Sequence, residues 1–154
     1  MIICRIKVLQ KKAVRTITLS KINAHTAPIF KNNNILTVDD IYKLQCLKFY
    51  HKYINNALPL NLLNLTIQQN FTIHNINTRQ ASLLHIPQIK TNIAKRSILH
   101  SIPAIVNSLP LNFSEKTHTH SLHGLSVYVK RYFISQYKET CAIENCYICN
   151  RDKS

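Results

Sequence analysis

The chain has 154 residues, of which 45% are hydrophobic, so it is long enough and apolar enough for one domain with its own core. Lysine and arginine number 20 against 6 acidic residues, and the resulting net charge of +14 favours a polyanionic partner, nucleic acid before membrane. The single glycine excludes glycine-rich phosphate loops, dinucleotide fingerprints and nucleophile elbows, and it disfavours a hairpin-rich all-β fold.

No apolar run approaches the roughly 18 residues that span a bilayer, and the first residues lack the basic and apolar regions of a secretory signal. Five cysteines, an odd number, favour reduced thiols or a metal over a disulfide framework. We therefore expect an intracellular protein, nuclear or cytoplasmic, that is neither secreted nor bound to a membrane. The basic N-terminal segment also fits a mitochondrial presequence, although a basic surface helix is the favoured interpretation.

Residues 2–19 have the pattern of an amphipathic helix. One apolar stripe recurs at steps of three and four residues and comprises Ile2, Ile6, Leu9, Ala13 and Ile17. The cations on the rest of the circumference are Arg5, Lys7, Lys11, Lys12 and Arg15. Because a solvated helix face would intersperse acids, and no acid precedes Asp39, this face is predicted to contact a polyanion.

A polar connector, residues 20–34, is expected to precede a second helix over residues 37–55. Thr37 and Asp40 have the spacing of a capping box, and Asp39 and Asp40 lie where the helix dipole favours negative charge. Two adjacent apolar stripes predict a central helix that is packed on two sides. The same two carboxylates superficially resemble a polymerase Asp-Asp pair, but no upstream acid could complete a two-metal site, so capping is the preferred role.

The second half of the chain has weaker patterns. Residues 60–71 are compatible with a helix, residues 74–78 with a loop, and residues 83–102 with a short β-hairpin. A short helix is expected to start near Pro103 and end before Pro110, and residues 121–137 predict a strong final helix. The overall prediction is a mainly α fold, with one helical domain over residues 1–138 and a Cys-rich tail over residues 139–154.

The tail contains the best candidate for a metal site. Cys146 and Cys149 have the two-residue spacing that presents two thiolates to one zinc ion, and Cys141 is a candidate third ligand. His118, His120 or His123 could supply the fourth, as could another chain, and we take His123 as the candidate. The alternative, three free thiols in a mobile tail, is slightly favoured over a metal site.

An independent enzyme is disfavoured. Eight histidines with almost no acids to orient them make a triad or a zinc hydrolase site hard to assemble. Tyrosines beside cations could instead stack on bases, and these are Tyr50, Tyr53, Tyr128 and Tyr132. For Tyr53 and Tyr132 a place in the core is the preferred interpretation.

Several stretches, in order, resemble the C-terminal part of reverse transcriptases from LINE-type, jockey-like non-LTR retrotransposons. They lie at residues 9–15, 23–31, 40–50, 74–79, 90–91, 96–98, 102–103, 107–110 and 145–149, and they include Lys-Leu-Gln-Cys-Leu-Lys-Phe-Tyr at residues 43–50 and Asn-Ser-Leu-Pro at residues 107–110. The resemblance covers nearly the whole chain, and the order and spacing of the stretches are more specific than any single one.

The resemblance implies a fragment of an RNA-directed DNA polymerase. The matched region follows the catalytic palm in that family and is similar to the thumb and post-thumb helices that hold template and primer. The chain is therefore expected to have no polymerase activity. It is expected to bind the phosphate backbone of RNA or of an RNA/DNA duplex and to contact the missing polymerase domains. The secondary backbone contacts would be Arg79, Lys95 and Arg96. A free-standing zinc-stabilised RNA- or DNA-binding module and a non-functional relic are the alternatives.

Overall fold

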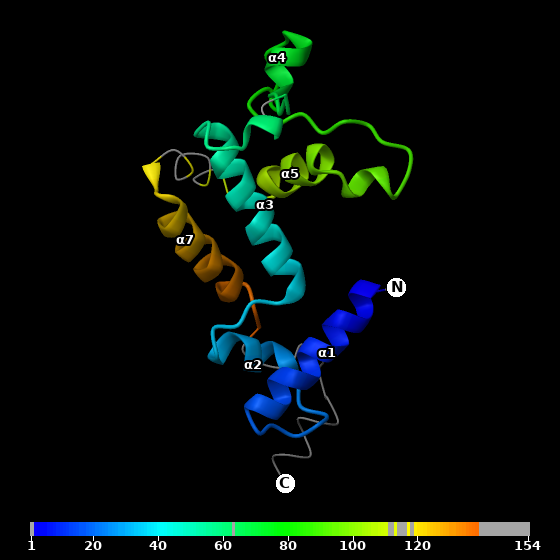
Figure 1. Cartoon of the computed structure of the whole chain (residues 1–154), viewed down its shortest axis with the longest axis vertical. Coiled ribbons are helices and arrows are strands. Elements are labelled where there is room, and N and C mark those ends of the chain that lie inside the picture. Colours follow the sequence, from blue (N-terminus) through cyan, green and yellow to red (C-terminus); the bar gives the residue numbers. More distant parts are fainter. Residues whose placement is uncertain (1, 63, 111–112, 114–116, 118, 139–154) are drawn as a thin grey trace. The chain divides into compact units, whose positions relative to one another are not determined.

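A computed structural model of the chain describes residues 2–62, 64–110, 113, 117 and 119–138. The fold is mainly helical, as predicted (Figure 1). The α-helices are α1 (Ile2–Ile17), α2 (Thr26–Asn32), α3 (Val38–Ile54), α4 (Asn70–His74), α5 (Ile98–Asn107) and α7 (Leu122–Ser135). Two 3₁₀ turns are η1 (Leu60–Leu62) and η2 (Ala94–Arg96).

The chain divides into two compact units, and both α3 and α7 contribute to each of them. The first unit comprises Met1–Tyr42 and Val127–Ser154, and the second comprises Lys43–Ser126. Buried hydrophobic side chains of the first unit are Val14, Phe30, Leu36, Val129, Phe133 and Ile134. Those of the second unit include Leu44, Leu47, Ala81, Leu84, Ile102, Phe113 and Leu125.

The predicted connector over residues 20–34 contains a helix, so that prediction was wrong in part. Helix α2 packs beside α1 and buries Thr26 and Phe30, which are four residues apart and share one face. Pro28 was interpreted as a breaker, but it occupies the first turn of α2, where a backbone N–H has no intrahelical acceptor.

Asparagine adopts the left-handed backbone conformation after several helices of this chain, a position that is most often occupied by glycine. Asn34, Asn56 and Asn75 follow α2, α3 and α4 with φ between 50° and 52°, and Leu19 follows α1 in the same conformation. After α2 and α3 the residue that follows this asparagine donates a backbone hydrogen bond to the carbonyl five residues earlier. The Ile35 N–H donates to the Phe30 carbonyl, and the Ala57 N–H donates to the Lys52 carbonyl. Asparagine tolerates this left-handed conformation better than other residues that carry a side chain, so a chain with one glycine can still end its helices sharply.

The two strongest predicted helices are confirmed, at Val38–Ile54 for α3 and Leu122–Ser135 for α7. In α3 the Leu44 and Leu47 row is buried, and Leu47 is completely enclosed. Ile41 and Tyr42, in the first turn and a half of α3, are 42% and 51% exposed, so the apolar positions of this helix are buried only in part.

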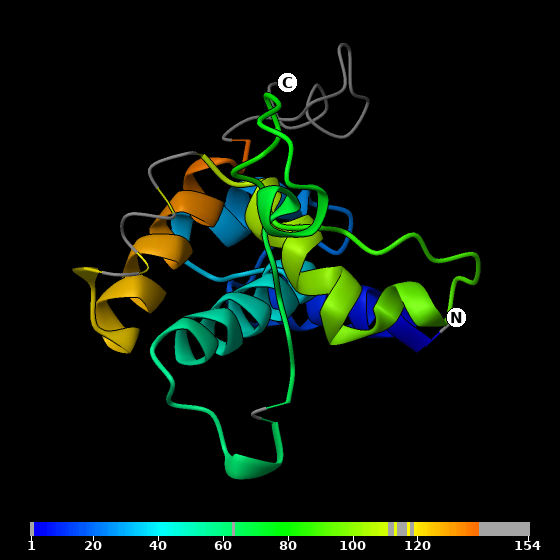
Figure 2. The same cartoon turned by 90° about the horizontal axis from the view of Figure 1, so that it is seen from above.

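The predicted hairpin over residues 83–102 is wrong. Ile98 and Ile102 lie four residues apart on α5, which begins five residues before the expected start at Pro103. Within the described residues the nearest thing to a strand pair is one isolated antiparallel bridge between Gln69 and Leu84. Residues 75–93 otherwise form a long irregular connection between α4 and η2 (Figures 1 and 2).

Two further predictions concern the C-terminal tail and membrane-spanning helices. Residues 139–154, the predicted Cys-rich tail, lie outside it. None of the helices inside it is both long enough and apolar enough to cross a bilayer.

Candidate nucleic-acid interface

The predicted phosphate-binding face lies on α1. Arg5, Lys11 and Lys12 are exposed, and Arg5 and Lys12 are two turns apart on one side of the helix, about 10 Å along its axis. The helix has no acid of its own. These three cations are therefore available to a polyanion along the length of α1.

The other two predicted cations of α1 have partners within the protein. Lys7 Nζ lies 2.7 Å from Asp39 Oδ2, and this hydrogen bond raises the pKa of Lys7. Arg15 Nε donates to the backbone carbonyl of Ala24 at 2.8 Å and so ties α1 to the connector before α2. Their role as phosphate contacts stays a prediction, and it would require them to share or exchange these partners.

The described members of the apolar stripe of α1 are exposed, although the apolar stripe of an amphipathic helix normally faces the core. Leu9 is 63% exposed and Ile17 75% exposed, while Ile6 and Ala13 are exposed as well. Helix α1 packs through the buried Val14, and Gln10 and Arg15 donate hydrogen bonds to the carbonyls of Leu36 and Ala24. An exposed row of aliphatic side chains on one helix is typical of a surface that another macromolecule covers.

We expect Leu9→Ala to change the unfolding free energy by less than about 0.5 kcal/mol, because its side chain is mostly in water. The matched control on the same helix, Val14→Ala, should cost about 1–3 kcal/mol, since Val14 is 4% exposed. Urea unfolding of both variants checks this. If the stripe were the buried face, Leu9→Ala would instead cost about 2–5 kcal/mol.

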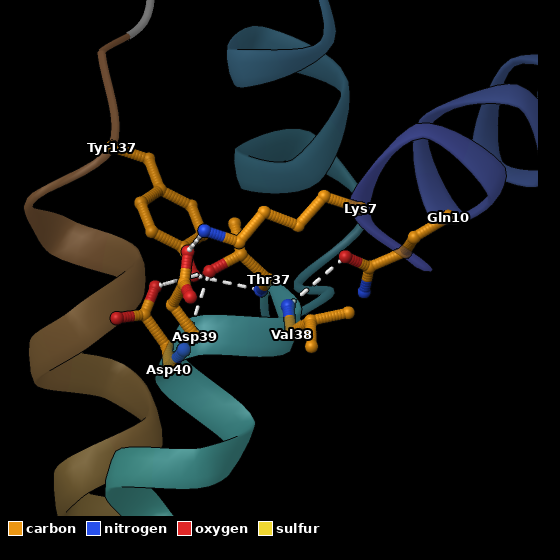
Figure 3. A network of polar contacts seen from close by, with 7 residues as sticks. All are labelled: Lys7, Gln10, Thr37, Val38, Asp39, Asp40 and Tyr137. Atoms are coloured by element: carbon orange, nitrogen blue, oxygen red, sulfur yellow. Dashed lines mark hydrogen bonds and ion pairs between the residues drawn. The ribbon is translucent and has the colours of Figure 1, made fainter. Parts of the chain in front are cut away.

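A polar network surrounds the first turn of α3 (Figure 3). The Asp40 N–H donates to Thr37 Oγ1 at 3.3 Å, and the Thr37 hydroxyl donates back to Asp40 Oδ2 at 2.7 Å. Tyr137, which follows α7, donates its hydroxyl to the same Asp40 oxygen and accepts the Thr37 N–H at 3.0 Å. The predicted cap is thus confirmed, and Tyr137 takes the place that the third-position carboxylate has in a capping box.

Gln10 of α1 completes the network. Its Oε1 accepts the Val38 N–H at 3.0 Å, and its Nε2 donates to the Leu36 carbonyl at 2.8 Å. Burial, and next the hydrogen bond to Asp40, raise the pKa of Tyr137 to about 12. The phenol therefore keeps its proton at neutral pH and remains a donor. One glutamine and one tyrosine, both distant in sequence, fasten the start of α3 to α1 and to the segment after α7.

The network has a consequence for the carboxylates. Asp39 and Asp40 are the only acidic residues in the described part of the chain, and each is engaged, Asp39 by Lys7 and Asp40 by Thr37 and Tyr137. Glu115, Glu139 and Glu144, which could join a catalytic cluster, lie outside that part. The pair has the surroundings of a helix cap.

The predicted secondary contacts belong to the second unit. Arg79 is exposed in the irregular segment after α4, and Lys95 and Arg96 are exposed on η2. A side-chain contact holds this turn, because Ser101 Oγ donates to the Lys95 carbonyl at 3.3 Å. The two cations of η2 are therefore presented next to the start of α5.

The metal prediction is not decided by the geometry. Cys141, Cys146 and Cys149 lie outside the described residues, and His123 is exposed on α7. Among the residues that are described, no three His, Cys, Asp or Glu side chains gather closely enough to hold an ion. A zinc site at these cysteines stays a prediction.

Gln10 and Tyr137 are the functional side chains that sequence patterns did not single out. Each acts through a long-range contact, Gln10 on Val38 and Tyr137 on Asp40, and no local periodicity marks either residue. The one available signal was that Thr37-Val38-Asp39-Asp40 predicts a cap whose remaining N–H groups need acceptors from elsewhere.

Comparison with known proteins identifies no relative. No protein-family profile matches the chain, and no curated protein or solved structure is significantly similar to it. The functional interpretation therefore depends on the charge and geometry of the described residues, together with the resemblance in the sequence.

Proposed function

We propose that this chain binds the phosphate backbone of RNA or of an RNA/DNA template–primer duplex. Its α1 cations, Arg5, Lys11 and Lys12, would make the primary contacts, and the cations of the second unit would make the secondary ones. In this proposal the chain is a fragment similar to the thumb region of a LINE-type reverse transcriptase. It acts inside the cell, in the nucleus or cytoplasm, and it does not polymerise nucleotides itself.

The observation that carries the proposal is the separation of charge on the described surface. Three exposed cations lie along one acid-free helix, and the nearby acids are engaged by Lys7, Thr37 and Tyr137. Carboxylates near a phosphate would repel it. Lys7 offsets this charge at Asp39, whereas the Thr37 and Tyr137 hydroxyls hold Asp40 at the start of α3 without changing its charge. Among the described residues both carboxylates, Asp39 and Asp40, have partners within the protein, and for this reason we propose binding without polymerisation.

The exposed stripe of α1 supports a second partner, the catalytic domains of the polymerase. The described stripe residues Ile6, Leu9, Ala13 and Ile17 are exposed, whereas the helix packs through Val14. A thumb helix with one apolar side and one cationic side could contact protein on the first and nucleic acid on the second. This arrangement would explain why one helix carries both surfaces.

A salt titration of binding to an RNA/DNA duplex tests the proposal. With about 0.9 counterions released per phosphate contact, the three α1 cations predict a log–log slope near −3, and six cations including Arg79, Lys95 and Arg96 predict about −5. The same complex, supplied with nucleotides and Mg²⁺, should incorporate none. A slope near zero would overturn backbone binding, and metal-dependent primer extension would overturn the proposed lack of polymerase activity.

A further inference from the structure

The second unit contains a cavity of about 240 Å³ between α3, the Gln69–Leu84 bridge and the end of α5. Its wall is held by Asn107, whose Oδ1 accepts the Leu84 N–H at 3.0 Å and whose Nδ2 donates to the Leu84 carbonyl at 2.8 Å. The volume is below the ~300 Å³ at which sites for drug-sized ligands begin. The cavity therefore has room for a single ring system on a preformed frame.

An aromatic platform lines one side of this cavity. The half-buried ring of Tyr50 stacks on Tyr53, with 6.4 Å between ring centroids and 24° between ring planes. Tyr53 is fixed in turn, because its hydroxyl accepts the Ile67 N–H at 3.0 Å. Burial raises the pKa of Tyr50, so its phenol is neutral at physiological pH. Tyr50 therefore presents a neutral aromatic ring with an ordered support.

Three polar side chains at the cavity have unused hydrogen-bonding capacity. Gln69 precedes α4 but makes no side-chain capping bond, and its carboxamide is exposed. In the described part of the chain neither it, nor the exposed Ser82 hydroxyl, nor the Tyr50 hydroxyl has a hydrogen-bond partner, whereas both ends of Asn107 are used. A carboxamide pairs with the donor and acceptor edge of a base, and an aromatic ring stacks on its face.

The described residues of the second unit carry a charge that suits a nucleic-acid strand. They include no acid, and the lysines and arginines among them are Lys43, Lys48, Lys52, Arg79, Lys90, Lys95 and Arg96. We propose that the cavity binds one unpaired nucleobase of a single-stranded RNA, with Tyr50 stacking on the base and Gln69 reading its edge. This inference depends on the proposed backbone binding and adds to it a site that recognises a base.

The test compares two short single-stranded RNAs that differ only in one central nucleotide, which is intact in one and abasic in the other. The intact strand should bind the full chain about 5- to 150-fold more tightly, the range expected for one stacked base. Equal affinities for both strands would overturn the base site and leave backbone binding in place. Loss of all salt-dependent binding would instead overturn backbone binding itself.

Variants identify the site. Tyr50→Leu keeps apolar volume but removes the ring, and it should abolish the difference between the strands. Tyr42→Leu, on the same helix but outside the cavity, should keep that difference. Gln69→Ala alters an exposed side chain that makes no hydrogen bond among the described residues, so it should reduce the difference without unfolding the chain. A full difference in both Tyr50→Leu and Gln69→Ala would overturn the proposal, and competition by a free nucleoside, which carries no phosphate, would support binding of the base itself.

Discussion

Replacing Asp40 with alanine should lower the unfolding free energy by about 2–3 kcal/mol. The carboxylate is 8% exposed and accepts hydrogen bonds from the Thr37 and Tyr137 hydroxyls, so its removal leaves two donors without their acceptor. Bonds to a charged acceptor contribute more than neutral ones. For a chain of this length the loss corresponds to roughly 5–10 °C in melting temperature, measured together with urea unfolding.

The neighbouring residue provides a matched control. Asp39 carries the same charge at the same helix end, but its side chain is 52% exposed and pairs with an exposed lysine. Asp39→Ala should therefore cost no more than about 1 kcal/mol, and that cost should shrink in high salt. Equal losses at the two positions would mean that helix-dipole charge, rather than the Tyr137 network, stabilises the start of α3.

A double-mutant cycle measures the coupling energy between the Tyr137 hydroxyl and the Asp40 carboxylate. If Tyr137→Phe and Asp40→Ala act on one network, their combined cost should be less than the sum of the single costs by about 1 kcal/mol. Additive costs would show that the Tyr137 hydroxyl is satisfied by water instead.

The bounds of the long helices could be predicted because their signals are local. The start of α3 follows from Thr37 and Asp40, and the presence of α7 follows from a repeat of apolar residues that includes Leu125 and Val129, both buried. The same local rule failed over residues 83–102, where Ile98 and Ile102, four residues apart on α5, were both assigned to the second strand of the predicted hairpin.

The side on which α1 packs could not be predicted, because packing is decided by distant residues. The apolar stripe marks an amphipathic helix, but Gln10 binds Val38 across 28 residues and thereby turns the polar side of α1 toward the start of α3. Tyr137 meets Asp40 across 97 residues. The periodicity of apolar residues indicates that a helix is amphipathic. Which side of it is buried depends on the residues from elsewhere in the chain that pack against it.

Replacing Arg5, Lys11 and Lys12 together with glutamine should lower affinity for an RNA/DNA duplex by roughly 100-fold at about 0.15 M salt. Each lost phosphate contact removes about 0.9 released counterions, so the slope of the salt titration should become less negative by about 2.7. The helix itself should persist, because glutamine is a good helix former and the three positions are exposed.

The decisive control removes the same charge from another face of the first unit. Lys130, Arg131 and Lys138 are exposed on and after α7, and their replacement with glutamine lowers the net charge by the same three units. If α1 contacts phosphates directly, this control should weaken binding less than about 5-fold, since screened charges beyond a Debye length contribute little. Equal losses from both triple variants would mean that binding follows net charge alone, and α1 would then be one basic surface among several instead of the nucleic-acid interface.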